Sequence, residues 1–203
     1  FRGCENMGTD YGMIMAVLGG DDAGGGVTWA PHVIEDAKAH GLILGENGKL
    51  YDSKKGENLP DGVSPMPLLT QAELDKVDCP SAMQVIGGYV RRYLDMVALA
   101  EDAPVKVIGE NGIIRDKPGF EIDFITRACA SEEMHKHDRP SVLMPVKGHW
   151  RVDYEGGSAT LAPGDTMSVP EGLMHRAVPS MTGEAALYHI IATDDAAGAT
   201  WQG

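Results

Sequence analysis

Three histidines stand at positions where metal chemistry is possible, and two of them form a close pair. His135 and His137 are separated by one residue. In a β-strand, side chains two residues apart leave the same face, so both imidazoles would point the same way. Neutral imidazoles are common ligands of divalent metals, and such a pair supplies half of a metal site. The alternative is that both are surface histidines of the polar run 131–139.

The third histidine ends a spaced pattern of turn residues further along the chain. This pattern consists of Gly164, Pro170, Gly172 and His175. Proline followed by glycine favours a tight turn. On its own, His175 has an alternative interpretation as an ordinary histidine after a turn, and the pair upstream makes a shared metal site the better hypothesis.

Together, these two motifs resemble those of the cupin superfamily. The first is the His-x-His pair followed by ten residues and Gly148, and the second is the turn pattern that ends at His175. The resemblance covers about residues 121–192 and implies an all-β domain, a small antiparallel jelly-roll barrel. It also implies that His135, His137 and His175 bind one divalent metal inside the barrel.

The chain departs from the cupin pattern at the position of the usual fourth ligand. Typical cupins have a glutamate four or five residues after the second histidine, where this chain has Ser141 and Val142. Asp138 is adjacent to His137 and would point to the opposite face. The expected site therefore has three imidazoles and no carboxylate. Such a site leaves a divalent ion with its full charge and with open positions for a chelating anion and O₂.

As a duplicated cupin with three histidines, the chain resembles ring-cleaving dioxygenases of the gentisate and salicylate type. Residues 135–148 are similar in spacing to the iron-binding segment of these enzymes. This resemblance implies Fe(II) as cofactor and, as partners, O₂ and a small hydroxylated aromatic acid. The segment 135–148 departs from these enzymes at Leu143, where a basic residue that pairs with the substrate carboxylate is expected. Two other functions remain open. One is a cupin isomerase or lyase with Zn²⁺, Mn²⁺ or Ni²⁺, and the other is a non-catalytic module that binds a metal or a small ligand.

An internal repeat of long period suggests how the chain is organised. Residues 1–29 are similar to residues 174–201 at an offset of 173, with an apolar strand, Asp-Asp-Ala and Thr-Trp in the same order. Self-similarity of this kind predicts two copies of one domain, so we interpret the chain as a fragment or processed product of a duplicated cupin. The expected domains are the last strands of a truncated first copy over 1–29, a linker over 30–104, and a second barrel with the metal site over 105–203.

We expect the metal site of the first copy to be degenerate. Arg2 occupies the position that His175 has in the second copy. A guanidinium group has no lone pair available for a metal. We therefore expect the metal in the second barrel; the alternative is that Arg2 belongs to an unrelated loop.

The elements that must position the histidines can be predicted from apolar spacing and turn residues. We expect a strand over 10–20, a helix over 31–41, a hairpin over 42–52, a short helix opened by a capping box at 70–73, and a helix over 81–100. After Pro104 the pattern changes to short strands separated by Gly, Pro or Asp turns at intervals of about 8–12 residues, which is typical of a sandwich or barrel.

Composition and charge agree with a turn-rich globular protein and exclude several partners. The chain has 203 residues, 26 of them Gly and 12 Pro, and 43% are hydrophobic. The net charge of −13 argues against nucleic acid or an anionic membrane as a partner. No apolar run approaches the ~18 residues of a membrane span, and no signal-peptide pattern is present.

The cysteines and the family resemblance suggest the environment of the protein. Its three cysteines, Cys4, Cys79 and Cys129, form no CxxC pair. An odd, scattered set argues against a disulfide framework, and we expect a cytoplasmic protein. The resemblance to duplicated cupins further implies a homo-oligomer.

Several other residues could contribute to a site, although a structural role is favoured for each. Arg127 and Arg176 could hold a carboxylate, and surface salt bridging is the favoured role. Cys129 is expected to be a buried thiol rather than a nucleophile. Core packing, rather than substrate stacking, is expected for Trp150, Tyr188 and His189.

Overall fold

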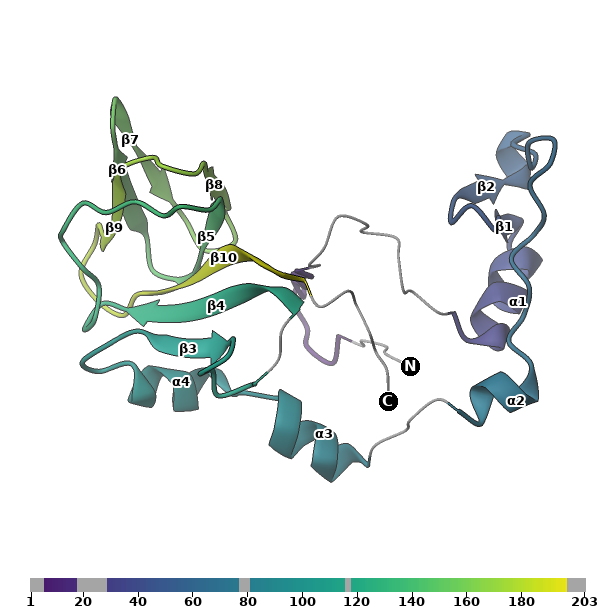
Figure 1. Cartoon of the computed structure of the whole chain (residues 1–203), viewed down its shortest axis with the longest axis horizontal. Coiled ribbons are helices and arrows are strands. Elements are labelled where there is room, and N and C mark those ends of the chain that lie inside the picture. The colour runs from purple at the N-terminus through teal and green to yellow at the C-terminus, as the bar shows by residue number, and fades with distance from the viewer. Residues whose placement is uncertain (1–5, 18–28, 77–80, 116–117, 197–203) are drawn as a thin grey trace. The chain divides into compact units, whose positions relative to one another are not determined.

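The computed structural model describes residues 6–17, 29–76, 81–115 and 118–196 (Figure 1). These residues belong to two compact units. The first contains the described residues up to 76, and the second contains those from 81 onward. In the described part of the chain, no helix combines the length and the apolar character needed to cross a bilayer.

The first unit contains short helices and one hairpin. Its elements are α1 (Pro31–Ala39), β1 (Leu42–Leu44), β2 (Leu50–Asp52), the 3₁₀-helix η1 (Ser53–Lys55) and α2 (Gln71–Leu74). Pro31 opens α1, where its missing N–H costs no helical hydrogen bond. The hairpin closes over Gly48, which has a φ of 75°, and Thr70 and Glu73 form the predicted capping box. The predicted helix, hairpin and capping box are thus confirmed.

The strand predicted over 10–20 is wrong for residues 10–17. These residues have no regular secondary structure, and Tyr11, Met13 and Ile14 are exposed. An apolar run forms a strand only when it finds a neighbouring strand, and no pairing partner for it lies in the described residues. Residues 18–20, together with Arg2 and Trp201, fall outside the described residues.

The second unit is predominantly β, with two antiparallel sheets. The strand order is β3-β4-β10-β5-β8 in the larger sheet and β7-β6-β9 in the smaller. The strands are β3 (Val105–Ile108), β4 (Pro118–Thr126), β5 (Ser141–Lys147), β6 (Trp150–Tyr154), β7 (Gly157–Leu161), β8 (Met167–Val169), β9 (His175–Pro179) and β10 (Ala186–Ala196).

The core of this unit lies between the two sheets. Leu143 and Leu187 from the larger sheet pack with Trp150 and Val152 from the smaller sheet. All four are at most 2% exposed. The face of each sheet that carries these residues is the inner face, and it is this face that lines the interior around the histidines described below.

The outer face of the larger sheet is covered by the helix α4 (Tyr93–Leu99). The rings of Tyr93 and Phe124 meet edge-on with centroids 5.8 Å apart. The Tyr188 hydroxyl lies 3.9 Å from the sulfur of Met96, and Thr126 Oγ1 donates to the carbonyl of Ala100 at 2.6 Å. α4, which the sequence analysis grouped with the linker, therefore packs on the sheet.

The single helix predicted over 81–100 is wrong, because two helices occupy this segment. α3 (Ala82–Tyr89) ends at Val90, whose backbone is extended, and α4 begins after Arg92. Two glycines weaken the end of α3, and Arg91 stabilises the break. Its side chain donates to the carbonyls of Gly87, Val90 and Ile113 at 2.6–3.0 Å.

Candidate metal centre

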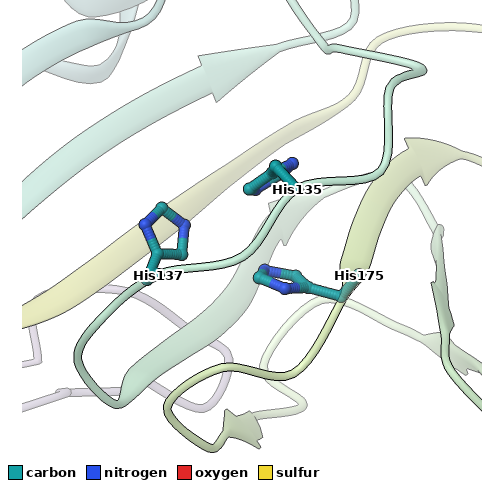
Figure 2. Close-up of side chains that lie close together, drawn as sticks. All are labelled: His135, His137 and His175. Atoms are coloured by element: carbon teal, nitrogen blue, oxygen red, sulfur yellow. The ribbon is translucent and has the colours of Figure 1, made fainter.

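The three predicted histidines converge in the second unit (Figure 2). His135 and His137 lie on the segment between β4 and β5, and His175 is the first residue of β9. The ring centroids are 4.6 Å apart for His135–His175, 5.1 Å for His135–His137 and 5.6 Å for His137–His175. One nitrogen from each ring lies within 4.8 Å of the other two.

The backbone, and not a regular strand, positions the His-x-His pair. His135 and His175 form an isolated antiparallel bridge and exchange two backbone hydrogen bonds, of 2.9 and 2.8 Å. Gly172 donates its N–H to the carbonyl of His137 at 2.8 Å and has a φ of 76°, which glycine adopts without strain. The Pro-x-Gly turn of the second motif therefore holds the first motif directly.

Hydrogen bonds to carbonyls orient two of the rings. Nδ1 of His175 lies 3.0 Å from the Leu173 carbonyl, and Nδ1 of His135 lies 3.3 Å from the Glu133 carbonyl. A carbonyl can only accept, so each Nδ1 carries the proton and each Nε2 keeps its lone pair. This is the tautomer that a metal bound through Nε2 requires.

Two nitrogens of the three imidazoles are buried and have no hydrogen-bond partner among the described residues. Nε2 of His137 and Nε2 of His175 are buried and make no hydrogen bond within the described residues. A buried polar atom without a partner destabilises a fold, and such atoms point to a ligand or ion that pairs with them. Two bonds of about 2.1 Å to one ion separate the bonded nitrogens by at most ~4.2 Å. Small side-chain rotations would therefore bring the rings onto one metal, and the donor set fits a divalent ion.

Burial favours the neutral, metal-binding form of His137 and His175. Burial lowers the pKa of His137, and the neighbouring His135 and His175 lower it further. Burial likewise lowers the pKa of His175, an effect that His135 reinforces. Metal binding therefore does not have to displace protons from these two rings at neutral pH.

The described residues bring no carboxylate into the group of metal-binding atoms. The atoms that lie within 4.8 Å of one another are all imidazole nitrogens. Asp138 is exposed, and Ser141 occupies the usual glutamate position with its side chain buried. Asp123 acts electrostatically on His137, and its own carboxylate is paired with Lys106 at 3.2 Å.

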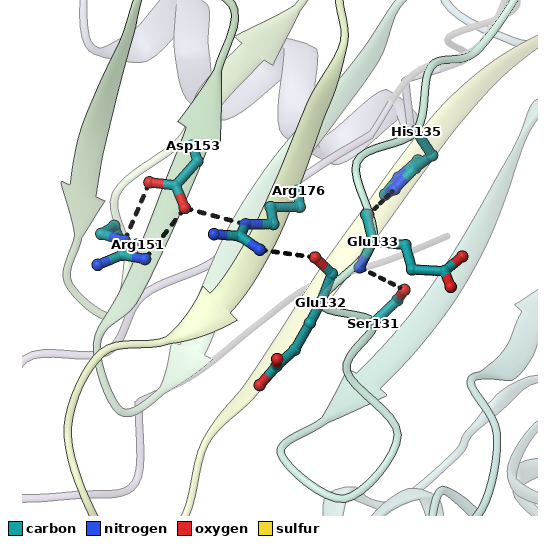
Figure 3. Close-up of polar contacts among 7 residues, drawn as sticks. All are labelled: Ser131, Glu132, Glu133, His135, Arg151, Asp153 and Arg176. Atoms are coloured by element: carbon teal, nitrogen blue, oxygen red, sulfur yellow. Dashed lines mark hydrogen bonds and ion pairs between the residues drawn. The ribbon is translucent and has the colours of Figure 1, made fainter.

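Arg176 points away from His135 and forms a hydrogen bond to the segment that carries it (Figure 3). Its Nε lies 3.0 Å from Oδ2 of Asp153, and its Nη1 donates to the Glu132 carbonyl at 2.7 Å. Arg151 forms a second ion pair with Asp153 at 3.0 Å. The predicted salt bridge of Arg176 is confirmed, and it links β9 to the backbone three residues before His135.

Arg127 and Cys129 have structural contacts. Arg127 donates to the carbonyls of Gly183 and Met181, which fixes the loop before β10. The salt bridge expected for it is not found among the residues that the structure describes. The half-buried sulfur of Cys129 accepts a hydrogen bond from the Thr126 N–H at 3.3 Å. Neither residue is turned toward the histidines by these contacts.

A fourth histidine lies beside the three predicted ones. His189, on β10, is 5% exposed, and its ring centroid is 4.8 Å from that of His137 and 6.2 Å from that of His175. Burial, reinforced by the other histidines, lowers the pKa of His189 to about 3. A core position is expected for His189 from the sequence, but its proximity to the other histidines is not. Alternation along the strand indicates that His189 shares a face with Leu187, whereas only the pairing of β10 with β4 and β5 places it beside His137. Trp150 is fully buried and Tyr188 packs on Met96, so the packing roles expected for both are confirmed.

Neither a family model nor a curated protein matches the chain, whereas solved structures do. A protein of Neisseria meningitidis is 21% identical, with a TM-score of 0.40, over 51% of this chain and 99% of its own. A cupin-2 domain protein of Shewanella frigidimarina is 17% identical, with a TM-score of 0.40, over 51% of this chain and 94% of its own. Hydroxypropylphosphonic acid epoxidase of S. wedmorenis is 19% identical, with a TM-score of 0.33, over 36% and 44%.

Proposed function

We propose that the second unit is a cupin barrel that binds one divalent metal through His135, His137 and His175. The observation that carries the proposal is the pair of buried, unpartnered Nε2 atoms of His137 and His175 beside the third imidazole. The carbonyl contacts of His135 and His175 support it, because they leave the lone pairs on the inner nitrogens.

We further propose that the metal is Fe(II) and that the protein is a dioxygenase that cleaves the ring of a small hydroxylated aromatic acid. Three neutral ligands leave the charge of a divalent ion undiminished and half of an octahedral sphere open. When bound there, iron would supply the path for electrons between a chelated substrate and O₂. The proposal of an iron dioxygenase is supported by the donor set, which consists of imidazoles and includes no carboxylate among the described residues.

In this proposal the metal binds the substrate, and the residues of the chain enclose it. Leu143 is 2% exposed and lies on the inner face, where the resembled dioxygenases have a basic residue. Arg127 and Arg176 are held by carbonyls and by Asp153. The substrate carboxylate would therefore be bound by the metal and not by these two arginines. The apolar core between the sheets closes the inner side of the site to water.

Metal stoichiometry followed by oxygen consumption tests the proposal. Purified protein would be loaded with Fe²⁺, Mn²⁺, Zn²⁺ or Ni²⁺, and its metal content would be measured by mass spectrometry. We expect about one ion per chain, and O₂ uptake with hydroxybenzoates only in the iron form. The variant His149→Ala, which alters an exposed histidine outside the site, serves as the control and should keep its metal.

The other outcomes separate the alternative functions. Turnover with zinc that does not depend on O₂ would identify a Lewis-acid isomerase or lyase and overturn the dioxygenase proposal. A bound metal without any turnover would support a binding module. Failure to bind any of the four ions would overturn the metal site itself.

A further inference from the structure

Two more buried polar side chains lie on the inner face of the larger sheet without hydrogen-bond partners. They are His189 on β10 and Ser141 on β5, which are 5% and 3% exposed. Neither Nε2 of His189 nor Oγ of Ser141 makes a hydrogen bond to any described residue. Buried polar atoms are almost always paired, so two unpaired ones on adjacent strands indicate a ligand that completes them.

The strand register places both side chains on the inner face. His189 lies directly opposite Leu143, which belongs to the core between the sheets. Ser141 precedes Leu143 by two residues on the same strand and so shares its face. The ring of His189 stands 4.8 Å from that of His137. His189 therefore adjoins the proposed metal position, and Ser141 lies on the same inner face of the sheet.

His189 is placed beside the ligand set rather than within it. The group of nitrogens within 4.8 Å of one another includes those of His135, His137 and His175, and no atom of His189. The His189 nitrogen thus remains available to a molecule that occupies the open positions of the metal.

The charges beside His189, on the same inner face of the sheet, favour a neutral oxygen as the partner. Asp123 lies directly opposite His189 on β4, and Lys106 lies directly opposite Asp123 on β3. Lys106 is paired with Glu121 at 2.6 Å and with Asp123 at 3.2 Å, so its charge is compensated. Lys106, Glu121 and Asp123 together carry a net negative charge. This charge would repel a carboxylate at His189 but not a hydroxyl or carbonyl oxygen.

We propose that His189 and Ser141 form a subsite for an uncharged oxygen of the substrate, a hydroxyl or a carbonyl, beyond the oxygens that chelate the metal. This inference rests on the proposed metal site. It narrows the substrate class to small chelating acids with an additional neutral oxygen. It also explains why two buried polar side chains have no hydrogen-bond partner among the described residues.

A pair of chelating probes tests the subsite on the Co²⁺-loaded chain of 203 residues. Lactate and glycerate both chelate through a carboxylate and the adjacent hydroxyl, and glycerate has one further hydroxyl. Binding would be followed through the visible absorption of the cobalt. We expect the wild type to bind glycerate about threefold to tenfold more tightly, which corresponds to one or two additional hydrogen bonds.

Variants assign this preference to the two side chains. His189→Leu and Ser141→Ala should keep the cobalt and bind both probes equally, and His189→Asn, which keeps a hydrogen-bonding group, should restore part of the preference. The matched controls His149→Leu and Ser168→Ala change exposed residues and should behave as wild type. We also expect Ser141→Ala to raise the melting temperature of the metal-free protein, because it removes an unpaired buried hydroxyl.

The outcomes distinguish this inference from the proposed function. No preference in the wild type, no binding of either probe, or an unchanged preference in the variants would overturn the subsite while the metal site stands. Loss of cobalt from His189→Leu alone would make His189 a metal ligand and overturn the subsite as well. Failure of the wild type to take up cobalt would overturn the proposed function on which the inference depends.

Discussion

His135 and His175 are joined through their backbones by two hydrogen bonds, of 2.9 and 2.8 Å, although they are 40 residues apart in the sequence. These hydrogen bonds fix the two backbones relative to each other, and so they also fix the positions from which the two imidazoles project. Because the backbone forms this bridge, removal of either ring leaves the bridge intact. The site can then be dissected without unfolding the second unit.

The first prediction concerns the ligands themselves. His135→Ala should remove the bound metal while the protein keeps its far-ultraviolet circular dichroism. The affinity loss should exceed the roughly 10- to 100-fold effect of changes outside the ligand shell. Cys129→Ala, which alters a nearby thiol, should keep its metal. Equal metal content in both variants, measured by mass spectrometry after dialysis, would contradict the assignment.

The second prediction concerns the support of His135 by Arg176. Arg176→Ala should weaken metal binding roughly tenfold, because it frees the Glu132 carbonyl and the segment before His135. Arg151→Ala leaves the contacts of Arg176 in place and should have little effect. Competition with a chelator measures both affinities. The idea fails if the two variants lose affinity equally.

The third prediction is a pH dependence of stability in the metal-free protein. In the folded chain His189 takes up a proton only near pH 3, whereas an unfolded histidine does so near pH 6.5. The unfolded state therefore binds more protons between these values, and His189 should reduce stability as the pH falls from about 6.5 toward 3. Melting temperatures of wild type and His189→Leu should diverge below pH 6.5. Parallel curves would show that His189 does not have the low pKa.

The fourth prediction concerns the turn that holds His137. Gly172→Ala should destabilise the protein by about 1–2 kcal/mol, because a β-carbon is strained at a φ of 76° even though it would meet open space. It should also weaken metal binding, since Gly172 donates to the His137 carbonyl. Gly183→Ala, at a φ of 94° and also in open space, should cost similar stability in urea unfolding but leave the metal affinity unchanged.

The convergence of the three histidines and the mainly β character of the second unit could be predicted from the sequence, because both depend on local spacing. The turn at Gly172 and the alternation along β5 are encoded within a few residues. The importance of His189 and Ser141 could not be predicted in the same way. It arises from the placement of β10 between β4 and β5, which is a long-range pairing that no local pattern reveals.

Two local predictions were wrong for a related reason. The helix over 81–100 has suitable apolar spacing, yet Arg91 satisfies the carbonyls of Gly87 and Ile113 in a way that only the folded chain provides. The apolar residues at 10–17 likewise suit a strand but have no neighbour to pair with in the described part of the chain. In both segments the tertiary contacts of the folded chain, and not the local propensity of the residues, determine the secondary structure.

Successive residues of β10 face opposite surroundings, since Tyr188 contacts α4 and His189 adjoins the cluster of imidazoles. A strand cannot turn one of these side chains without moving the other. A larger side chain at position 96 would displace Tyr188 and, through the backbone of β10, shift His189 on the opposite face of the sheet, where a substrate oxygen is expected to bind. The selectivity of this protein could in that way be tuned by mutations in a helix that never touches what the protein binds.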